Sequence, residues 1–161
     1  MYDHQPTVVS TSDHDRLQAV MCTMIGLRTP IASLLRHKLG SALVMFPGDI
    51  SPDVVVPGRR VHFTIDGSRT DMRVLTWDFP VRDTGMELSL LVPRGLALLG
   101  LRAGQSFSYT TTMRRTELIE VDSVVPDEDT ALPNEPRHET PVAIDRSDRA
   151  EAAAAWDPQY F

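Results

Sequence analysis

Apolar residues in the N-terminal third of the chain recur with the spacing of an α-helix. One set lies at positions i, i+3, i+4, i+7 and i+8 and comprises Leu17, Val20, Met21, Met24 and Ile25. Such a set forms one stripe along a helix. Ser12 is placed to cap this helix, with Asp15 three residues later as its acidic partner. We therefore expect the first helix to begin near residue 12.

A second apolar stripe follows after a break at residues 26–30. Thr29 is suited to cap a second helix, Pro30 fits its first position, and Gly40 is placed to end it. The members of this stripe are Ile31, Leu34, Leu35, Leu39, Ala42 and Leu43. Two narrow stripes joined by a short loop predict an antiparallel helical hairpin over 11–46, in the form of a short coiled coil. Residues 1–10 are expected to be a flexible N-terminus.

From residue 51 to 125 the pattern changes to the period of two that is typical of β-strands. Apolar and polar residues alternate over 61–65, which predicts a strand, and Asp66 and Gly67 mark the turn after it. A second strand is predicted over 72–79, with one face directed toward the core. That face comprises Arg73, Leu75, Trp77 and Phe79. Further strands are predicted at 88–92, 107–109 and 117–124.

A short helix is expected just before the last two strands. Pro93 suits its first position, and Gly100 suits the left-handed position that closes a helix. Leu96 and Leu99 are expected to fill the core. A sheet with one inserted helix predicts an α+β domain with an antiparallel sheet over 51–125.

Composition and charge set the C-terminal segment 126–161 apart. It has few large apolar residues, five prolines, and nine acidic side chains against three arginines. It therefore carries the whole net charge of −6, while residues 1–125 balance 13 basic with 13 acidic side chains. We expect a disordered acidic tail. Its end, 155–161, contains three aromatics, so a short docking motif is the alternative to a solvated terminus.

The same observations exclude several functional classes. A neutral body argues against a broad or sequence-specific nucleic-acid surface. There is no run of ~18 apolar residues, so no membrane span is expected. The single cysteine, Cys22, fits a reducing compartment, which predicts a cytoplasmic location. The five histidines lack the spacing of a metal site, and no phosphate-binding loop is recognisable. We expect no metal, no cofactor and no enzyme activity.

One continuous block carries a resemblance to a known family. The run from Leu88 to Gln105, LSLLVPRGLALLGLRAGQ, resembles the C-terminal domain of the GreA/GreB transcript cleavage factors. Within that group it is most similar to the regulator of nucleoside diphosphate kinase (Rnk) family, and the run from Pro52 to Phe63 agrees. The likeness covers about 11–125 and leaves the acidic tail outside. Two places depart from it: 57–58, and 110–115, which replaces the family's usual Pro-Gly-Gly hairpin turn.

The resemblance implies an FKBP-like α+β domain in a bacterial protein that binds RNA polymerase near its secondary channel. The helical hairpin would be directed inward. Partner contacts are expected around the short helix, at Pro93, Arg94, Gly95, Leu98 and Arg102, and on the hairpin, at Arg28, Arg36 and Lys38. The alternative is that the proline, glycine and leucine shape the turn and core while the basic side chains form a solvated face.

The resemblance also raises the question of transcript cleavage. Gre factors help to hold a catalytic magnesium ion with two acidic residues at the tip of a long coiled coil. Here no Asp or Glu occurs between Asp15 and Asp49. Each predicted helix has about 15 residues and is therefore only ~22 Å long. We therefore expect no cleavage activity, and the family relationship suggests competition with Gre factors. Two other functions stay open. One is an FKBP-like prolyl isomerase or small-ligand protein that uses Trp77, Phe79 and Tyr109, and the other is an adaptor for a different protein.

Overall fold

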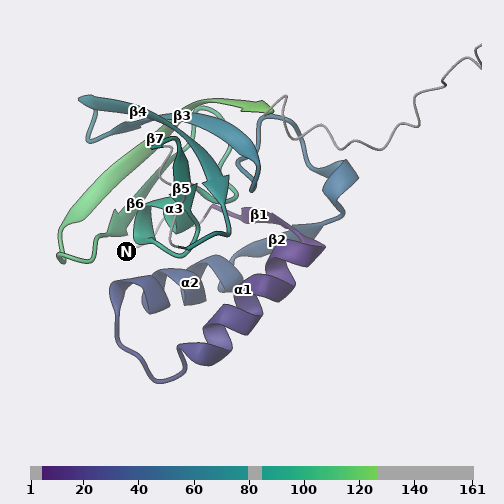
Figure 1. The fold of residues 1–161 in the computed structure, drawn as a ribbon, viewed down its shortest axis with the longest axis vertical. Coiled ribbons are helices and arrows are strands. Elements are labelled where there is room, and N and C mark those ends of the chain that lie inside the picture. Colours follow the sequence, from purple (N-terminus) through teal and green to yellow (C-terminus); the bar gives the residue numbers. More distant parts are fainter. Residues whose placement is uncertain (1–4, 80–84, 127–161) are drawn as a thin grey trace, which may run out of the picture. The chain divides into compact units, whose positions relative to one another are not determined.

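A computed structural model of the chain describes residues 5–79 and 85–126. The helices are α1 (Thr11–Thr23), α2 (Pro30–Gly40) and α3 (Pro93–Leu98), with the 3-10 turn η1 (Pro47–Asp49). The strands are β1 (Thr7–Ser10), β2 (Ala42–Met45), β3 (Arg59–Ile65), β4 (Arg69–Thr76), β5 (Glu87–Ser89), β6 (Ser106–Thr110) and β7 (Thr116–Pro126). The expected α+β class is confirmed, with short helices beside a curled sheet (Figure 1).

The helical hairpin is framed by two short parallel strands. β1 pairs with β2 from Thr7 opposite Ala42 to Ser10 opposite Met45. All four residues of β1 are buried, so the expected flexibility of 1–10 is wrong for 7–10. Ala42 and Leu43, expected on the second helix, belong to β2 instead. Four-residue strands are too short to show a clear period of two, which explains why the pattern did not reveal them.

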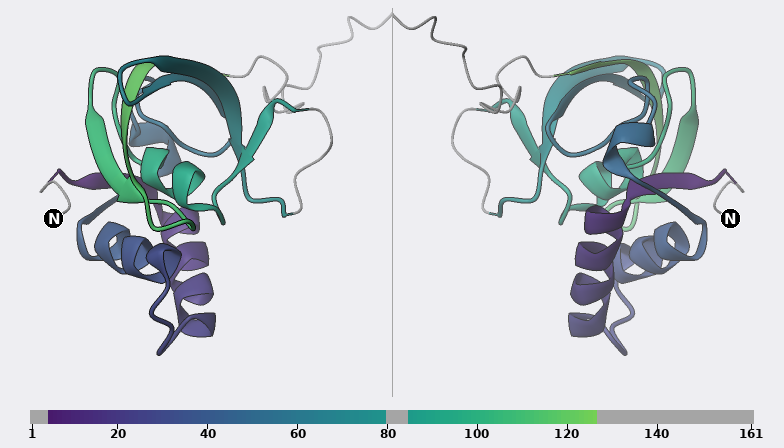
Figure 2. Two further views of the ribbon diagram at one scale, coloured as in Figure 1. Left: turned by 90° about the vertical axis from the view of Figure 1, so that its left-hand side faces the viewer. Right: turned by 90° about the vertical axis from the view of Figure 1, so that its right-hand side faces the viewer.

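The ends of the two helices follow local capping chemistry. α1 begins at Thr11 because Ser10, not Ser12, is its cap: the Ser10 hydroxyl oxygen accepts the Asp13 backbone N–H at 3.0 Å. The predicted cap of α2 is confirmed, since Thr29 accepts the backbone N–H of residue 32 at 3.3 Å. The coiled coil is not evident, because α1 and α2 cross at an angle rather than running side by side (Figures 1 and 2).

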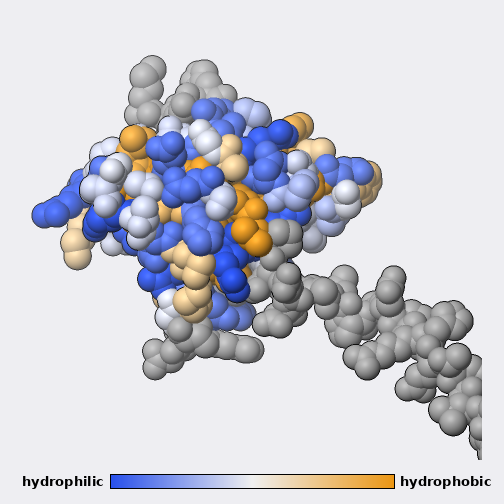
Figure 3. Space-filling view, turned by 90° about the horizontal axis from the view of Figure 1, so that it is seen from above, coloured by the Kyte–Doolittle hydropathy of each residue, from blue (hydrophilic) through white to orange (hydrophobic). Residues whose placement is uncertain are grey.

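A five-stranded sheet in the order β5-β4-β3-β7-β6 forms the second part of the fold. Most neighbours are antiparallel, but β5 runs parallel to β4, so the expectation of a purely antiparallel sheet is wrong. Alternation along a strand fixes which face a side chain takes, not the direction of the neighbouring strand. The sheet curls around α3 (Figure 2). On the face seen from above, hydrophilic side chains predominate and hydrophobic ones are scattered (Figure 3).

The core lies between the curled sheet, α3 and the helical hairpin. Leu96 and Leu99 are buried as expected. Gly100 has φ +78°, as its predicted role requires, and a Cβ there would lie 2.7 Å from the backbone N of Val8 in β1. Phe79, expected on an inner face, is 66% exposed because β4 ends at Thr76 before reaching it.

The structure describes almost none of the acidic tail. The expected disorder of the acidic tail lies outside the described residues, apart from Pro126 at the end of β7. Within 5–79 and 85–126, no helix is both long enough and apolar enough to cross a membrane.

Candidate functional site

The connection from β5 into α3 is a tight, strongly constrained turn. Pro93 occupies the first position of α3, and Val92 before it is extended. The Ser89 hydroxyl accepts the backbone N–H of Leu91 at 3.1 Å. A Cβ at Gly95 would lie 2.8 Å from the Ser89 carbonyl carbon and closer still to its oxygen, so only glycine fits there. The turn therefore brings the start of α3 into close contact with the end of β5.

An open groove of about 210 Å³ lies beside this turn. Its lining residues are Leu88, Val92, Pro93, Arg94, Tyr109, Thr111 and Thr112. Apolar side chains come from β5 and the start of α3, while the two threonine hydroxyls come from the turn between β6 and β7. The groove thus joins an apolar wall to a polar one, an arrangement that is typical of small binding sites.

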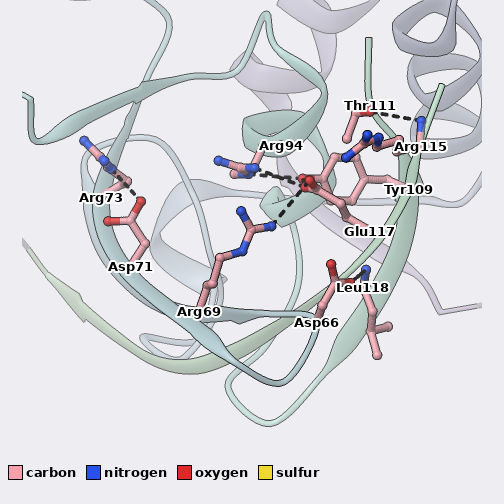
Figure 4. A network of polar contacts seen from close by, with 10 residues as sticks. All are labelled: Asp66, Arg69, Asp71, Arg73, Arg94, Tyr109, Thr111, Arg115, Glu117 and Leu118. Atoms are coloured by element: carbon pink, nitrogen blue, oxygen red, sulfur yellow. Dashed lines mark hydrogen bonds and ion pairs between the residues drawn. The ribbon is translucent and has the colours of Figure 1, made fainter. Parts of the chain in front are cut away.

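A polar network links Arg94 of the groove to the last two strands (Figure 4). Arg94 donates from Nε to the Tyr109 hydroxyl at 3.1 Å and from a terminal nitrogen to Glu117 Oε2 at 3.1 Å. The Tyr109 hydroxyl donates to the same carboxylate oxygen. Arg69 lies 3.6 Å from the other oxygen, Glu117 Oε1. Tyr109 and Glu117 are directly opposite each other across β6 and β7, which brings the network together.

The electrostatics of this network keep each group in its ordinary charge state at neutral pH. Burial alone would raise the pKa of Glu117, but hydrogen bonds from Tyr109 and Arg94 and the nearby positive charges hold it below its usual value. Burial, with the hydrogen bond to Glu117, raises the pKa of Tyr109 to about 12. Arg94 loses some solvation, but its bonds to Tyr109 and Glu117 raise its pKa on balance. The network therefore positions Arg94 and provides neither a general base nor a nucleophile near pH 7.

The expected contact residues around α3 do not share one surface. Arg94, which is half-buried, and Pro93, which is buried, line the groove. Gly95 and Leu98 are buried in the core, so neither is exposed to a partner in this structure. Arg102 is exposed in the turn after α3, where its backbone N–H donates to Gln105 Oε1 at 2.8 Å.

The three basic residues expected on the hairpin are also separated. Arg28 and Arg36 are exposed, and Arg36 donates to the Leu27 carbonyl oxygen at 2.8 Å. Lys38 is only 1% exposed, so its placement on a hairpin surface is wrong. Its ammonium donates to the carbonyl oxygens of Ala97 at 2.8 Å and Leu99 at 2.9 Å.

The position of Lys38 follows from its place on α2. It lies three residues after Leu35 and four after Leu34, on the apolar stripe of that helix, and all three are buried. Its ammonium is 4.3 Å from the ring centroid of Phe107, and burial lowers the pKa of Lys38 to about 7. The spacing of Lys38 from Leu34 and Leu35 predicts a buried side chain, whereas lysine as a residue type is usually exposed.

Other residues of the groove were not identified from the sequence. Glu117 and Arg69 join the site only through the pairing of β3 with β4 and β7, and of β6 with β7. Thr111 and Thr112 were noted only as part of a divergent turn. The sequence contained one usable clue: Tyr109 and Glu117 lie at similar distances from the middle of that turn, as hairpin partners do.

The aromatic residues of the alternative ligand pocket do not come together. Trp77 packs against the core, and its indole N–H donates to Asp13 Oδ1 at 2.9 Å. Phe79 is exposed, and only Tyr109 lines the groove. In the part of the chain that the structure describes, no group of three or more His, Cys, Asp or Glu is placed to hold a metal ion.

Comparison with known proteins places the chain in a family. No family model matches it. Over 107 residues it is 30% identical to the "Regulator of nucleoside diphosphate kinase" of Escherichia coli (strain K12), covering 65% of this chain and 79% of that protein. The protein of the same description from Shigella flexneri matches with the same identity and coverage.

A solved structure agrees with this assignment. "Prokaryotic transcription elongation factor GreA/GreB from Nitrosomonas europaea" superposes with a TM-score of 0.57 at 26% identity, covering 74% of this chain and 98% of that one. The resemblance first seen at residues 88–105 is therefore confirmed over most of the described fold. The chain belongs to the regulator of nucleoside diphosphate kinase family, with a fold like that of the GreA/GreB factors.

Proposed function

We propose that this chain is a cytoplasmic regulator of transcription that binds RNA polymerase near its secondary channel. The observation that carries this proposal is the likeness to the GreA/GreB elongation factor, which extends over 98% of that chain. Membership of the regulator of nucleoside diphosphate kinase family supports a regulatory role.

The groove beside α3 is the proposed docking site on this chain. It offers apolar surface at the half-buried side chains of Leu88 and Val92 for a partner side chain, with the buried Pro93 beside them. Arg94 is held in place by Tyr109 and Glu117, so little side-chain entropy is lost when it contacts a partner. Arginine is also one of the residue types that most often dominate the energy of protein interfaces.

The length and composition of the helical hairpin are arguments against transcript cleavage activity. α1 has 13 residues and α2 has 11, which correspond to lengths of about 20 Å and about 16 Å. No carboxylate occurs between Asp15 and Asp49, and Leu27 and Arg28 lie exposed between the helices. Carboxylate oxygens are what a magnesium ion would require from the tip. We infer that the chain has no catalytic role of its own and competes with Gre factors for polymerase.

A binding experiment tests the docking proposal. The labelled full chain is titrated with purified core RNA polymerase, with GreA as an unlabelled competitor. We expect saturable binding that GreA displaces. Thr112→Trp, which fills the groove, should weaken binding, while Ser123→Trp, at an exposed position of β7 outside the groove lining, serves as the control. Absence of binding by the wild-type chain at micromolar concentration would contradict the proposal.

A second experiment tests the absence of cleavage activity. Backtracked elongation complexes are incubated with this chain, with GreA, or with both. The chain alone should leave the cleavage rate at its background value, and an excess of it should slow the cleavage that GreA stimulates. Faster cleavage with this chain alone would show that the short hairpin does support the reaction.

A further inference from the structure

The turn between β6 and β7 has a defined conformation and an unusual exposed surface. The Thr111 backbone N–H donates to the Arg115 carbonyl oxygen at 2.8 Å, and the Arg114 N–H donates back to the Thr111 carbonyl at 2.9 Å. The Thr111 hydroxyl accepts the Arg115 N–H at 3.2 Å. Arg114 has φ +59°, a conformation that non-glycine residues rarely adopt. Met113 at the top of the turn is 82% exposed.

The turn carries two positive charges that are not neutralised within the described part of the chain. Arg114 and Arg115 are both exposed, and neither side chain forms an ion pair with a described carboxylate. The nearby acidic residue, Glu117, is already bonded to Arg94 and Tyr109 and faces Arg69 (Figure 4). The rim formed by 111–115 is therefore cationic.

The cationic rim directly adjoins the groove. Thr111 and Thr112 belong to the turn and also line the groove, together with the apolar residues Leu88, Val92 and Pro93. An occupant of the groove therefore contacts the turn that also carries Met113 and both arginines. The groove and the adjoining turn thus combine apolar residues, two threonines and two exposed arginines that have no acidic partner among the described residues.

We propose that the 111–115 turn selects the polymerase segment that the groove receives, and that this segment presents an apolar side chain flanked by carboxylates. This inference rests on the proposed function and names the chemistry of the partner. The apolar wall accommodates the apolar side chain, and the guanidinium groups of Arg114 and Arg115 pair with the carboxylates. A neutral or basic segment would leave both cations without partners, so charge complementarity discriminates against it.

The occupant is a protein segment rather than nucleic acid because of the apolar wall. A nucleic-acid site of this size would need several phosphate contacts or an exposed aromatic platform. Tyr109, the aromatic side chain of the groove, is 1% exposed and is bonded to Glu117. Its ring is therefore not presented as a stacking surface for bases.

The test compares charge removal with charge retention at the same two positions. Arg114→Gln/Arg115→Gln removes both charges, and Arg114→Lys/Arg115→Lys retains them at the same backbone strain. In the full chain, we expect the Gln variant to bind core polymerase roughly 5- to 30-fold more weakly, with a smaller dependence on salt. The Lys variant should bind within roughly threefold of the wild type. Arg115→Gln alone, which leaves the strained residue unchanged, should show about half the effect on a logarithmic scale.

Three outcomes would overturn the inference, and they can be told apart. If the wild type binds and the Gln variant binds equally well at every salt concentration, the rim does not select the partner, while the docking proposal stands. If the Gln substitutions abolish binding of a short RNA oligonucleotide but leave polymerase affinity unchanged, the rim contacts nucleic acid instead. If the wild type does not bind polymerase, both proposals fail together. Unfolding curves of all variants should coincide, because the substituted side chains are exposed.

Discussion

The Lys38 ammonium lies 2.8 Å from the carbonyl oxygen of Ala97, and this contact joins the helical hairpin to α3. A second bond to the Leu99 carbonyl oxygen and the nearby ring of Phe107 complete its surroundings. The two carbonyl groups lie at the end of α3, where helix carbonyls lack partners within the helix. Lys38 of α2 thus donates hydrogen bonds to carbonyl groups at the end of α3. The start of α3 lines the candidate groove.

Lys38→Met should destabilise the protein although methionine is apolar and of similar length. The substitution leaves the carbonyl oxygens of Ala97 and Leu99 buried without the Lys38 donor. We expect a loss of about 1–3 kcal/mol in the free energy of unfolding, measured by urea titration. Arg28→Met, at an exposed position just before α2, is the control and should change stability by less than about 0.5 kcal/mol. Equal stability of the wild type and Lys38→Met would mean that the two hydrogen bonds contribute nothing net.

The stability of the protein should rise with pH above neutrality because of Lys38. Its pKa is about 7 in the folded state, below the ordinary lysine value of 10.5, because burial disfavours the charged form. Between these values the unfolded chain binds more protons, so stability rises with pH at up to about 1.4 kcal/mol per pH unit. The contribution is fully present above the unfolded pKa and is lost as the pH falls toward the folded pKa. Subtracting the pH profile of Lys38→Met from that of the wild type isolates the effect, and a flat difference between pH 7 and 10 would refute it.

Glu117→Gln should lower the pKa of Tyr109 from its value of about 12. In the wild type, burial and the bond to the Glu117 carboxylate raise that pKa, while Arg94 opposes them. Removing the carboxylate charge leaves the opposing effect of Arg94. Ultraviolet titration follows the three tyrosines of the chain, and the one that ionises at the highest pH should shift downward in the variant. Glu120→Gln, at an exposed position of the same strand, should leave the titration curve unchanged.

Gly95→Ala should be among the most destabilising single substitutions in α3. A Cβ at this position overlaps the Ser89 carbonyl group, which is backbone and cannot move aside without disturbing β5. We expect a loss of more than about 3 kcal/mol, seen as a large fall in the thermal midpoint or as failure to fold. Gly40→Ala at the end of α2 meets no atom within 4 Å and should be neutral or stabilising by up to about 1 kcal/mol. Similar midpoints for the two variants would show that the β5–α3 turn is looser than described.

Much of the local structure could be predicted because it depends on neighbouring residues. Thr29 and Pro30 start α2, and Pro93 starts α3, through capping and backbone geometry that short stretches of sequence contain. Gly100 has the expected left-handed conformation. Errors arose where pairing between distant residues decides the outcome. β1 and β2 are separated by both helices, and neither strand is long enough to show a clear alternation.

The candidate site shows the same division between local and long-range information. Pro93 and Arg94 were identified because they belong to a continuous block with a recognisable pattern. Glu117 reaches Arg94 only through strand pairing, since 23 residues separate them in the chain. Strand register and curl are set by packing of the whole sheet, so a sequence pattern cannot assign such partners.

The sequence by itself determined that the helical hairpin has no carboxylate between Asp15 and Asp49, because this holds for any fold of the chain. It also determined the family, through residue types and spacings in one continuous run. Only the tertiary structure decided which basic residues face outward. Lys38 is inside and Arg114 and Arg115 are outside, because burial depends on where a helix stripe or a hairpin turn meets the rest of the molecule. A charged side chain is buried when other elements supply its hydrogen-bond partners, and for Lys38 those partners lie about 60 residues away.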